Sequence, residues 1–181
     1  NRELLHSQIT NREIRLQNLS FNKKWISSRG LVYFKASEVI DIPKHMKTEV
    51  YPSETVWLQN INRAMTLLPK SFNHKEYNLV DLGSGSGIAL LYFFENFKFL
   101  SYRGIDISKK MIKKSNKNLQ LYNNSNKKNI SYDNLNIANF FMDDKPTFFY
   151  MFNPFGKKII KKFLYNNIDR INKTESVLIY I

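Results

Sequence analysis

Short apolar runs alternate with longer helix-like stretches along most of this chain. Leu79 to Leu82 is a short run that is apolar except for Asp81, typical of a strand buried in a parallel sheet. Ile88 to Phe97 is apolar enough for a helix packed onto that sheet. Further strand-like runs lie at 102–107, from 129, at 147–155 and at 175–181, and helix-like stretches lie from 109 and at 157–172. This alternation predicts an α/β fold with a doubly wound, mostly parallel sheet.

The first part of the chain is patterned differently and predicts an N-terminal helical extension. Leucine and isoleucine recur near helical spacing within 2–19, which predicts an amphipathic helix there. One short strand-like run follows at 31–34. Ser53 is a suitable N-cap for the helix that precedes the first core strand. We therefore divide the chain into an extension, residues 1–50, and a core, residues 51–181.

Composition fits one folded domain. The chain has 181 residues, of which 43% are hydrophobic and 14% aromatic, enough to form a core. No apolar run approaches the roughly twenty residues that span a bilayer, and the N-terminus lacks the pattern of a secretion signal. We expect a cytoplasmic protein without membrane association. Cysteine is absent, and His6, His45 and His74 lack ligand spacing, so no metal site is expected.

A formal net charge of +13 is typical of proteins that bind nucleic acids. However, Asn, Lys and Ile are abundant together, which indicates an A- and T-rich coding sequence as one source of the lysines. The lysines gather on two predicted helices, beginning at 109 and 157, which a doubly wound sheet places on opposite faces. Because this divides the charge, a nucleic-acid partner is compatible with the sequence but not favoured, and most lysines are expected on solvated helix faces.

Three glycines at alternate positions, Gly83, Gly85 and Gly87, occupy the turn after the first core strand. Glycine permits positive φ angles and a close approach of the backbone to a ligand. The G-x-G-x-G spacing differs from the G-x-G-x-x-G of dinucleotide-binding turns, which disfavours a dehydrogenase. Asp81 would repel a pyrophosphate but suits an ammonium group. The turn therefore predicts a ligand that carries a positive charge and an adenosine.

The run Val80–Gly87 resembles the first motif of the class I S-adenosylmethionine-dependent methyltransferases. The resemblance covers roughly residue 51 to the last residue and implies a Rossmann-like methyltransferase core with S-adenosyl-L-methionine as its cofactor. It implies that Asp106 accepts hydrogen bonds from ribose hydroxyls and that Ile107 forms an apolar wall for the adenine. Asn136 stands where the family commonly has an aspartate that contacts the adenine amine, and its side-chain carbonyl is expected to make this contact.

The cofactor-binding residues implied in this way come from the glycine turn, the strand ends that follow it and the segment that precedes the core. Tyr51 is expected to lie over the turn, where groups that enclose the cofactor are usual. The full set is Tyr51, Asp81, Gly83, Ser84, Gly85, Gly87, Asp106, Ile107, Asn136 and Ile137.

Asn153, Pro154 and Phe155 resemble the family's fourth motif, which lies beside the transferred methyl group. The resemblance implies catalytic roles: Asn153 and the Pro154 carbonyl accept hydrogen bonds from a substrate N–H, and Phe155 stacks on a planar acceptor. Amino-methyltransferases that act on bases or glutamine have a second proline here, so that substrate class does not carry over. We expect methyl transfer to an unidentified acceptor, with nitrogen the candidate atom, in which the protein orients the reactants and removes water.

Other functions stay open at this point. The chain also resembles protein-lysine methyltransferases, whose aromatic channel Tyr51, Phe152 and Phe155 would line, and a nucleic acid is the other candidate acceptor. A noncatalytic Rossmann-like module that binds nucleic acid or a protein partner is the competing class. The family's usual last two strands do not follow the run at 175–181. The chain is therefore expected to be a fragment, or to form a homo-oligomer through this strand edge or the N-terminal helix.

Overall fold

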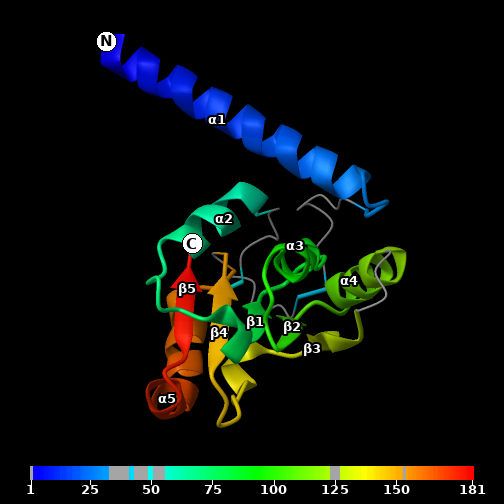
Figure 1. Ribbon diagram of the computed structural model, residues 1–181, viewed down its shortest axis with the longest axis vertical. Coiled ribbons are helices and arrows are strands. Elements are labelled where there is room, and N and C mark those ends of the chain that lie inside the picture. The colour runs from blue at the N-terminus through cyan, green and yellow to red at the C-terminus, as the bar shows by residue number, and fades with distance from the viewer. Residues whose placement is uncertain (1, 33–40, 43–48, 51–55, 123–126, 153) are drawn as a thin grey trace.

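The computed structural model describes residues 2–32, 41–42, 49–50, 56–122, 127–152 and 154–181, with the side chains of residues 2–11 and 128 excepted. Its elements follow the order that the sequence predicts (Figure 1). The α-helices are α1 (Arg2–Ser27), α2 (Leu58–Thr66), α3 (Ile88–Asn96), α4 (Lys109–Leu121) and α5 (Lys157–Lys173). The strands are β1 (Asn78–Leu82), β2 (Ser101–Asp106), β3 (Ile130–Asn134), β4 (Thr147–Met151) and β5 (Val177–Tyr180). The described residues also form the short 3-10 helices η3 (His74–Glu76), η4 (Lys127–Asn129) and η5 (Ile137–Asn139).

The five strands form one parallel sheet in the order β3-β2-β1-β4-β5. Leu79 of the central strand β1 is in register with Tyr102 of β2 on one side and Phe148 of β4 on the other. This arrangement confirms the predicted α/β fold. The direction in which the chain adds strands reverses between β1 and β4, and open α/β sheets bind ligands at the carboxyl ends of strands beside such a reversal.

Helices cover both faces of the sheet, and the alternation of side chains in β1 explains how. Leu79 belongs to the core cluster under α2, α3 and α4, whereas Val80 and Leu82 belong to the cluster under α5. Successive residues of a strand point to opposite faces, so a strand buried on both faces is apolar throughout. All three residues are 5% exposed or less, which accounts for the apolar positions on both sides of Asp81 that predicted this strand.

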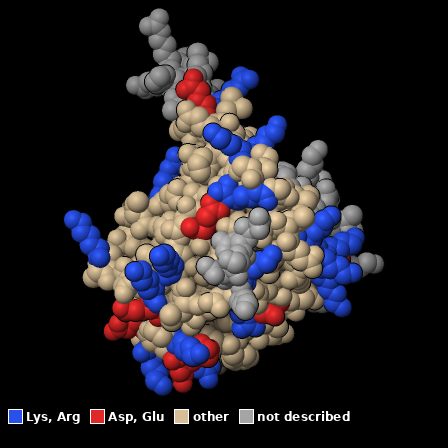
Figure 2. Space-filling view, turned by 45° about the vertical axis from the view of Figure 1, so that its right-hand side comes forward, with Lys and Arg blue, Asp and Glu red and all other residues tan. Residues whose placement is uncertain are grey.

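The lysines of α4 and α5 lie with their helices on opposite faces of the sheet, as predicted. Lys109, Lys113 and Lys117 are exposed on α4, and Lys157 and Lys161 are exposed on α5. Figure 2 shows Lys and Arg side chains in several separate groups over the face that it presents, with Asp and Glu between some of them. The charge on these two helices is therefore divided between two layers of the molecule.

The connection from β3 to β4 contains only the 3-10 helix η5, so part of one sheet face has no α-helix over it. Arg103 of β2 and Asp133 of β3 lie there and form a 2.6 Å salt bridge, with both side chains more than 40% exposed. Residues under a covering helix are usually apolar, so this solvated salt bridge is consistent with the absence of an α-helix over this part of the sheet among the described residues. On this face, α5 packs over the β1, β4 and β5 side, and residues of the η5 segment pack over Ile105 of β2.

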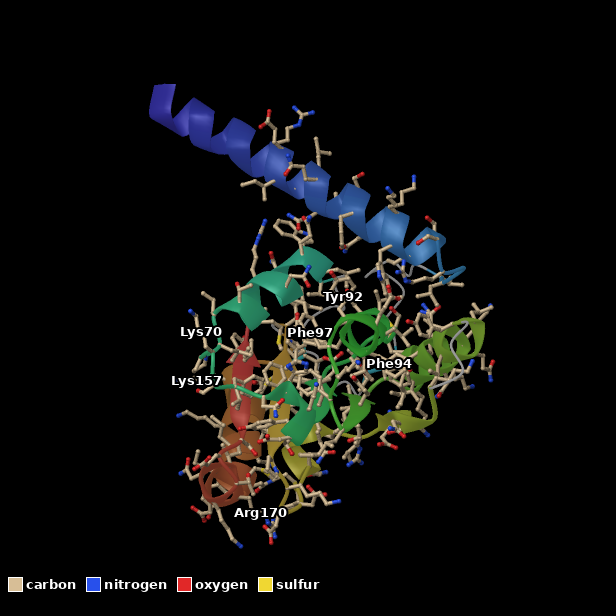
Figure 3. The ribbon with its side chains drawn as sticks, viewed as in Figure 1. Lys70, Tyr92, Phe94, Phe97, Lys157 and Arg170 are labelled. Carbon is tan, nitrogen blue, oxygen red and sulfur yellow. The ribbon has the colours of Figure 1, made fainter. Side chains whose placement is uncertain are left out.

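The N-terminal helix α1 is longer than predicted and ends at Ser27 rather than at residue 19. Its last turns attach it to the core: Trp25 is 7% exposed, and its ring lies 5.2 Å from that of Tyr92 in α3. Arg29, just after the helix, pairs with Glu95 near the end of α3. Figure 3 shows α1 lying across α2 and α3, with Tyr92 on the side of α3 that faces it. The N-terminal part of α1 projects beyond α2 (Figure 1).

Asn22 joins α1 to the start of α2 through two buried hydrogen bonds. Its Nδ2 donates to the Val56 carbonyl at 2.7 Å, and its Oδ1 accepts from the Leu58 N–H at 3.0 Å. Trp57, the N-cap residue, makes no capping hydrogen bond with its side chain, so another helix supplies the missing acceptor. The prediction that this helix begins after Ser53 is wrong, because Val56 and Trp57 are not helical. Ser53 itself lies outside the described residues.

Replacing Asn22 with alanine is expected to lower the free energy of unfolding by about 2–3 kcal/mol, because the Val56 carbonyl and the Leu58 N–H would lose these buried partners. Urea denaturation followed by circular dichroism measures the change. Asn116→Ala is the matched control, since Asn116 is exposed and its Nδ2 donates only to the Ile112 carbonyl of its own helix. The control should stay within about 0.5 kcal/mol of wild type, and equal losses in both variants would contradict the expectation.

Two predicted strands differ from the observed ones. As a regular strand, β4 ends at Met151 rather than at residue 155. Leu31 and Val32, from the strand-like run at 31–34, are not in a strand, and the rest of that run lies outside the described residues.

The strand β5 lies at the edge of the sheet and pairs with β4 alone among the described strands. Self-association through this edge or through α1 stays a prediction, as do the division into extension and core and the cytoplasmic location. No helix in the described ranges is long and apolar enough to cross a membrane. Within the same ranges, no three metal-ligating side chains gather into a group.

Candidate functional site

The turn between β1 and α3 is built on three glycines in the left-handed region. Gly83, Gly85 and Gly87 have φ angles of +86°, +52° and +79°, which confirms the predicted need for glycine. The N–H groups of Gly83 and Ser84 both donate to the Ile105 carbonyl of β2, at 2.8 and 2.9 Å. These bonds fix the turn at the carboxyl ends of β1 and β2.

Two of these glycines lie too close to neighbouring residues for any side chain. A Cβ on Gly83 would lie 2.4 Å from the Cβ of Pro154, and a Cβ on Gly87 would lie 2.5 Å from the Tyr132 hydroxyl. Both distances are well inside van der Waals contact. The first contact also brings Pro154, which follows β4, against the glycine turn, so described residues of two predicted motifs meet in the folded chain.

Asp106 ends β2, and its carboxylate holds both the glycine turn and the start of the next helix. Its Oδ2 accepts from the Gly85 N–H at 2.9 Å, and its Oδ1 accepts from the Ser108 N–H at 2.8 Å. Burial raises the pKa of this carboxyl to about 6, and the two N–H donors oppose the rise. At pH 7 and above, the group is therefore mostly an ionised acceptor at the edge of the sheet.

Asp81 lies in a row of residues that crosses the sheet below the turn. It is 3% exposed, and it is in register with Gly104 of β2 and Tyr150 of β4. Tyr132 of β3 fills the space over Gly104, where a Cβ would lie 2.5 Å from its ring. Asp81 Oδ2, Ser84 Oγ and the Tyr150 hydroxyl are buried and have no hydrogen-bond partner among the described residues.

The surroundings of Asp81 suit a cation. Burial raises the pKa of its carboxyl to about 8, and the negative charge of Asp106 adds to this. A buried carboxyl without a partner is costly unless it is protonated or meets a positive charge. An ammonium group carries that charge and several N–H donors, so the unpartnered Oδ2 fits the amino group of the predicted cofactor.

The other predicted cofactor contacts follow the ends of β2 and β3. Ile107 is half-buried and packs on the core cluster under α5. Asn136 caps η5, and its Oδ1 accepts from the Ala138 N–H at 2.9 Å. Ile137 is 1% exposed. The structure gives Asn136 a local role in this loop, and the contacts of Ile107, Asn136 and Ile137 with an adenine stay predictions.

Two predicted site residues, Tyr51 and Asn153, lie outside the described residues. Pro154 lies against the glycine turn. Phe155 is 5% exposed, pairs with Val50 through a backbone bridge and belongs to the core cluster under α5. The edge of its ring also lies near the glycine turn, with Cζ 3.4 Å from the position of a Cβ on Gly83. The catalytic roles of Asn153, Pro154 and Phe155 stay predictions.

Two acids that no sequence pattern signalled lie at the same edge of the sheet. Asp41 accepts hydrogen bonds from the Ser108 hydroxyl and the Lys110 N–H at the start of α4. Glu49 accepts from the Lys158 N–H at the start of α5. Capping patterns in a sequence lie next to their own helix, whereas these two acids are remote in sequence from the helices that they cap.

No family model and no curated protein sequence matches this chain. A structure assigned as an S-adenosyl-L-methionine-dependent methyltransferase from Methanococcus maripaludis is similar to it, with a TM-score of 0.50 and 20% identity, over 68% of this chain and 52% of that one. A Thermoplasma acidophilum protein gives a TM-score of 0.45 and 16% identity, over 67% and 61%. A Haemonchus contortus phosphoethanolamine N-methyltransferase, in complex with phosphoethanolamine and S-adenosylhomocysteine, gives 0.42 and 18%, over 57% and 21%.

The chain thus spans less than two thirds of each of these structures. At identities of 20% or below, the likeness is one of fold, and the Methanococcus structure is the match that bears on it. This chain has a parallel sheet, a glycine turn after its central strand β1 and an acid at the end of the neighbouring strand β2. It therefore has the Rossmann-like α/β fold of the class I S-adenosylmethionine-dependent methyltransferases.

Proposed function

We propose that this protein is an S-adenosylmethionine-dependent methyltransferase. The main support is one arrangement at the carboxyl edge of the sheet: a buried Asp81 Oδ2 on β1 that has no partner in the described part of the chain, three left-handed glycines, and a second carboxylate at the end of β2. A ligand with an ammonium group at one end and a ribose further along would meet Asp81 and Asp106 in turn. The fold alone supports no particular activity, so the proposal depends on these residues.

Each of these residues has a defined task in the proposed reaction. Asp81 accepts hydrogen bonds from the ammonium group, and Asp106 accepts hydrogen bonds from the ribose hydroxyls. The glycine turn lets a ligand lie directly on the backbone. The bound cofactor supplies a methyl group that its sulfonium charge has already activated. The protein therefore orients the acceptor and excludes water, and no strong base is required in the site.

We propose a nitrogen atom as the methyl acceptor. The contacts near Gly83 support this, because Pro154 and Phe155, the described residues of the predicted catalytic segment, both lie against the glycine turn. Carbonyl oxygens of this segment would accept hydrogen bonds from an acceptor N–H and so direct the nitrogen lone pair toward the methyl group.

Isothermal titration calorimetry with S-adenosylhomocysteine, the demethylated cofactor, tests the proposed function. We expect micromolar binding to the wild-type protein and none of NADH. Asp106→Asn should weaken binding by about tenfold at pH 8, because one charged acceptor for the ribose is lost. A folded protein that gives no heat with S-adenosylhomocysteine would contradict the proposal and favour a noncatalytic module instead.

A further inference from the structure

Asp41, in the segment between α1 and α2, holds the start of α4 from a distance of 67 residues in sequence. Its Oδ1 accepts from the Ser108 hydroxyl at 2.5 Å, and its Oδ2 accepts from the Lys110 N–H at 2.9 Å. Ser108 is the N-cap of α4 and also accepts from the Met111 N–H. One carboxylate therefore engages both the cap residue and the first turn of this helix.

The same cap residue is tied to the proposed ribose acceptor. The Ser108 N–H donates to Asp106 Oδ1 at 2.8 Å, and the Gly85 N–H donates to Asp106 Oδ2 at 2.9 Å. A continuous series of hydrogen bonds thus runs from Asp41 through Ser108 and Asp106 to the glycine turn. Any movement of Ser108 would change the position of the Asp106 carboxylate.

Glu49 provides a natural comparison, because it caps the other helix that begins at this edge. Its Oε2 accepts from the Lys158 N–H of α5 at 3.3 Å, and its backbone carbonyl accepts from the Gly156 N–H at 2.7 Å. Nothing in these contacts leads to Asp106. The two acids therefore share a capping role, and only Asp41 is linked to the predicted cofactor contacts.

We propose that Asp41 is a positioning residue for the cofactor: by holding Ser108, it orients the Asp106 carboxylate toward the ribose. This rests on the proposed function, since it concerns the same site. Asp41 touches neither the cofactor nor the acceptor in this account and acts through Ser108 alone.

The charge of Asp41 gives a second effect that a purely structural cap would not have. Asp106 is faced by Asp41 from the preceding segment, by Asp81 from β1 and by the N–H donors of Gly85 and Ser108. The negative charge of Asp41 raises the pKa of Asp106, after burial as the leading cause. Removing that charge while keeping one acceptor oxygen should therefore let Asp106 ionise at lower pH.

Three variants test the proposal by calorimetric titration with S-adenosylhomocysteine across a pH series. Asp41→Ala should weaken binding by about tenfold at pH 8, because Ser108 loses its anchor. Asp41→Asn keeps one acceptor oxygen and should recover most of that affinity, while the pH at which binding is half lost on the acid side moves downward. Glu49→Ala loses a comparable cap at α5 and should bind within about twofold of wild type.

Hydrogen–deuterium exchange of the free protein provides a measurement of local opening that needs no cofactor. Asp41→Ala should speed exchange of the amides at 106–112, and Glu49→Ala should not. Unchanged affinity in Asp41→Ala, or an equal loss in Glu49→Ala, would overturn the proposal while wild-type binding still upheld the proposed function. Failure of the wild-type protein to bind would overturn both, and the exchange data would then report only on the cap.

Discussion

Replacing Gly85 with valine is expected to abolish binding of S-adenosylhomocysteine, with an affinity loss of more than about a hundredfold, while the protein still unfolds cooperatively. Gly85 has a φ of +52° and lies in the middle of the glycine turn, with its N–H on Asp106 Oδ2 at 2.9 Å. A β-branched side chain at positive φ is strained by about 1–2 kcal/mol. It would also occupy the face of the turn that the ligand needs, and it would shift the N–H away from Asp106.

Gly30→Val is the matched control for this experiment. Gly30 also has a positive φ, +64°, and a Cβ there would meet nothing within 4 Å. The control therefore carries the same backbone strain without crowding and lies outside the glycine turn. Calorimetric titration measures whether each variant binds the ligand, and melting curves measure its stability. Together they distinguish backbone strain, which both variants share, from obstruction of the ligand site, which is expected only in Gly85→Val. Retained binding in Gly85→Val would mean that the ligand does not lie on this turn.

Asp81→Asn is expected to weaken binding of S-adenosylhomocysteine by up to about a hundredfold at pH 8.5, because the ammonium group loses the charge of the carboxylate proposed as its partner. Burial raises the pKa of Asp81 to about 8, so the carboxyl is largely protonated in the free protein at pH 7. Ammonium binding favours the ionised form and should release close to one proton per ligand at that pH. The release should decline as the pH rises above about 8, and at pH 7 it should be largely lost in the variant.

The same carboxyl makes stability depend on pH in a defined direction. In the unfolded chain its pKa returns to the ordinary value of 3.8, so between 3.8 and about 8 the folded protein binds a proton that the unfolded chain does not. The free energy of unfolding therefore falls as pH rises across this interval. Asp81→Asn removes that dependence, so its gain in Tm over wild type should grow between about pH 5 and about pH 8.

Titrations in two buffers of different ionisation enthalpy measure the proton release, and calorimetric melts of wild type and variant measure the stability. Asp133→Asn is a suitable control, because Asp133 is a half-exposed partner in the surface salt bridge with Arg103. This substitution should have little effect on ligand binding or on how the free energy of unfolding changes with pH. A wild-type protein that binds S-adenosylhomocysteine without releasing a proton at pH 7 would exclude Asp81 as the ammonium site.

The parts of the fold that could be read from the sequence are those that local chemistry determines. The apolar run at Leu79–Leu82 predicted a buried strand because both faces of that strand are covered. The three glycines predicted a turn with positive φ angles because other residues rarely adopt them. The strand-like run at 102–107 predicted the strand that Asp106 ends, and the Asp106 carboxylate holds the turn there.

Other features depend on contacts that no local pattern contains. The start of α2 could not be located from Ser53, because its capping acceptor comes from Asn22 on another helix. The C-terminal turns of α1 bury Trp25 against Tyr92 of α3, and no local pattern shows that α3 is the partner of this helix. Helical spacing in a sequence does not identify the partner of a buried face.

By itself, the sequence determined the order of strands and helices along the chain, the glycine turn, and the two carboxyls on the first two core strands. These features depend on strand burial and positive φ angles, which leave a pattern within a few neighbouring residues. Only the tertiary structure decided how these groups work together. It left Asp81 Oδ2 buried without a hydrogen-bond partner among the described residues, packed Pro154 against Gly83, and brought Asp41 and Glu49 to the helix starts at the edge of the sheet. The reason is physical: desolvation, steric contact and remote capping depend on which residues become neighbours when the chain folds, and sequence spacing does not record those neighbours.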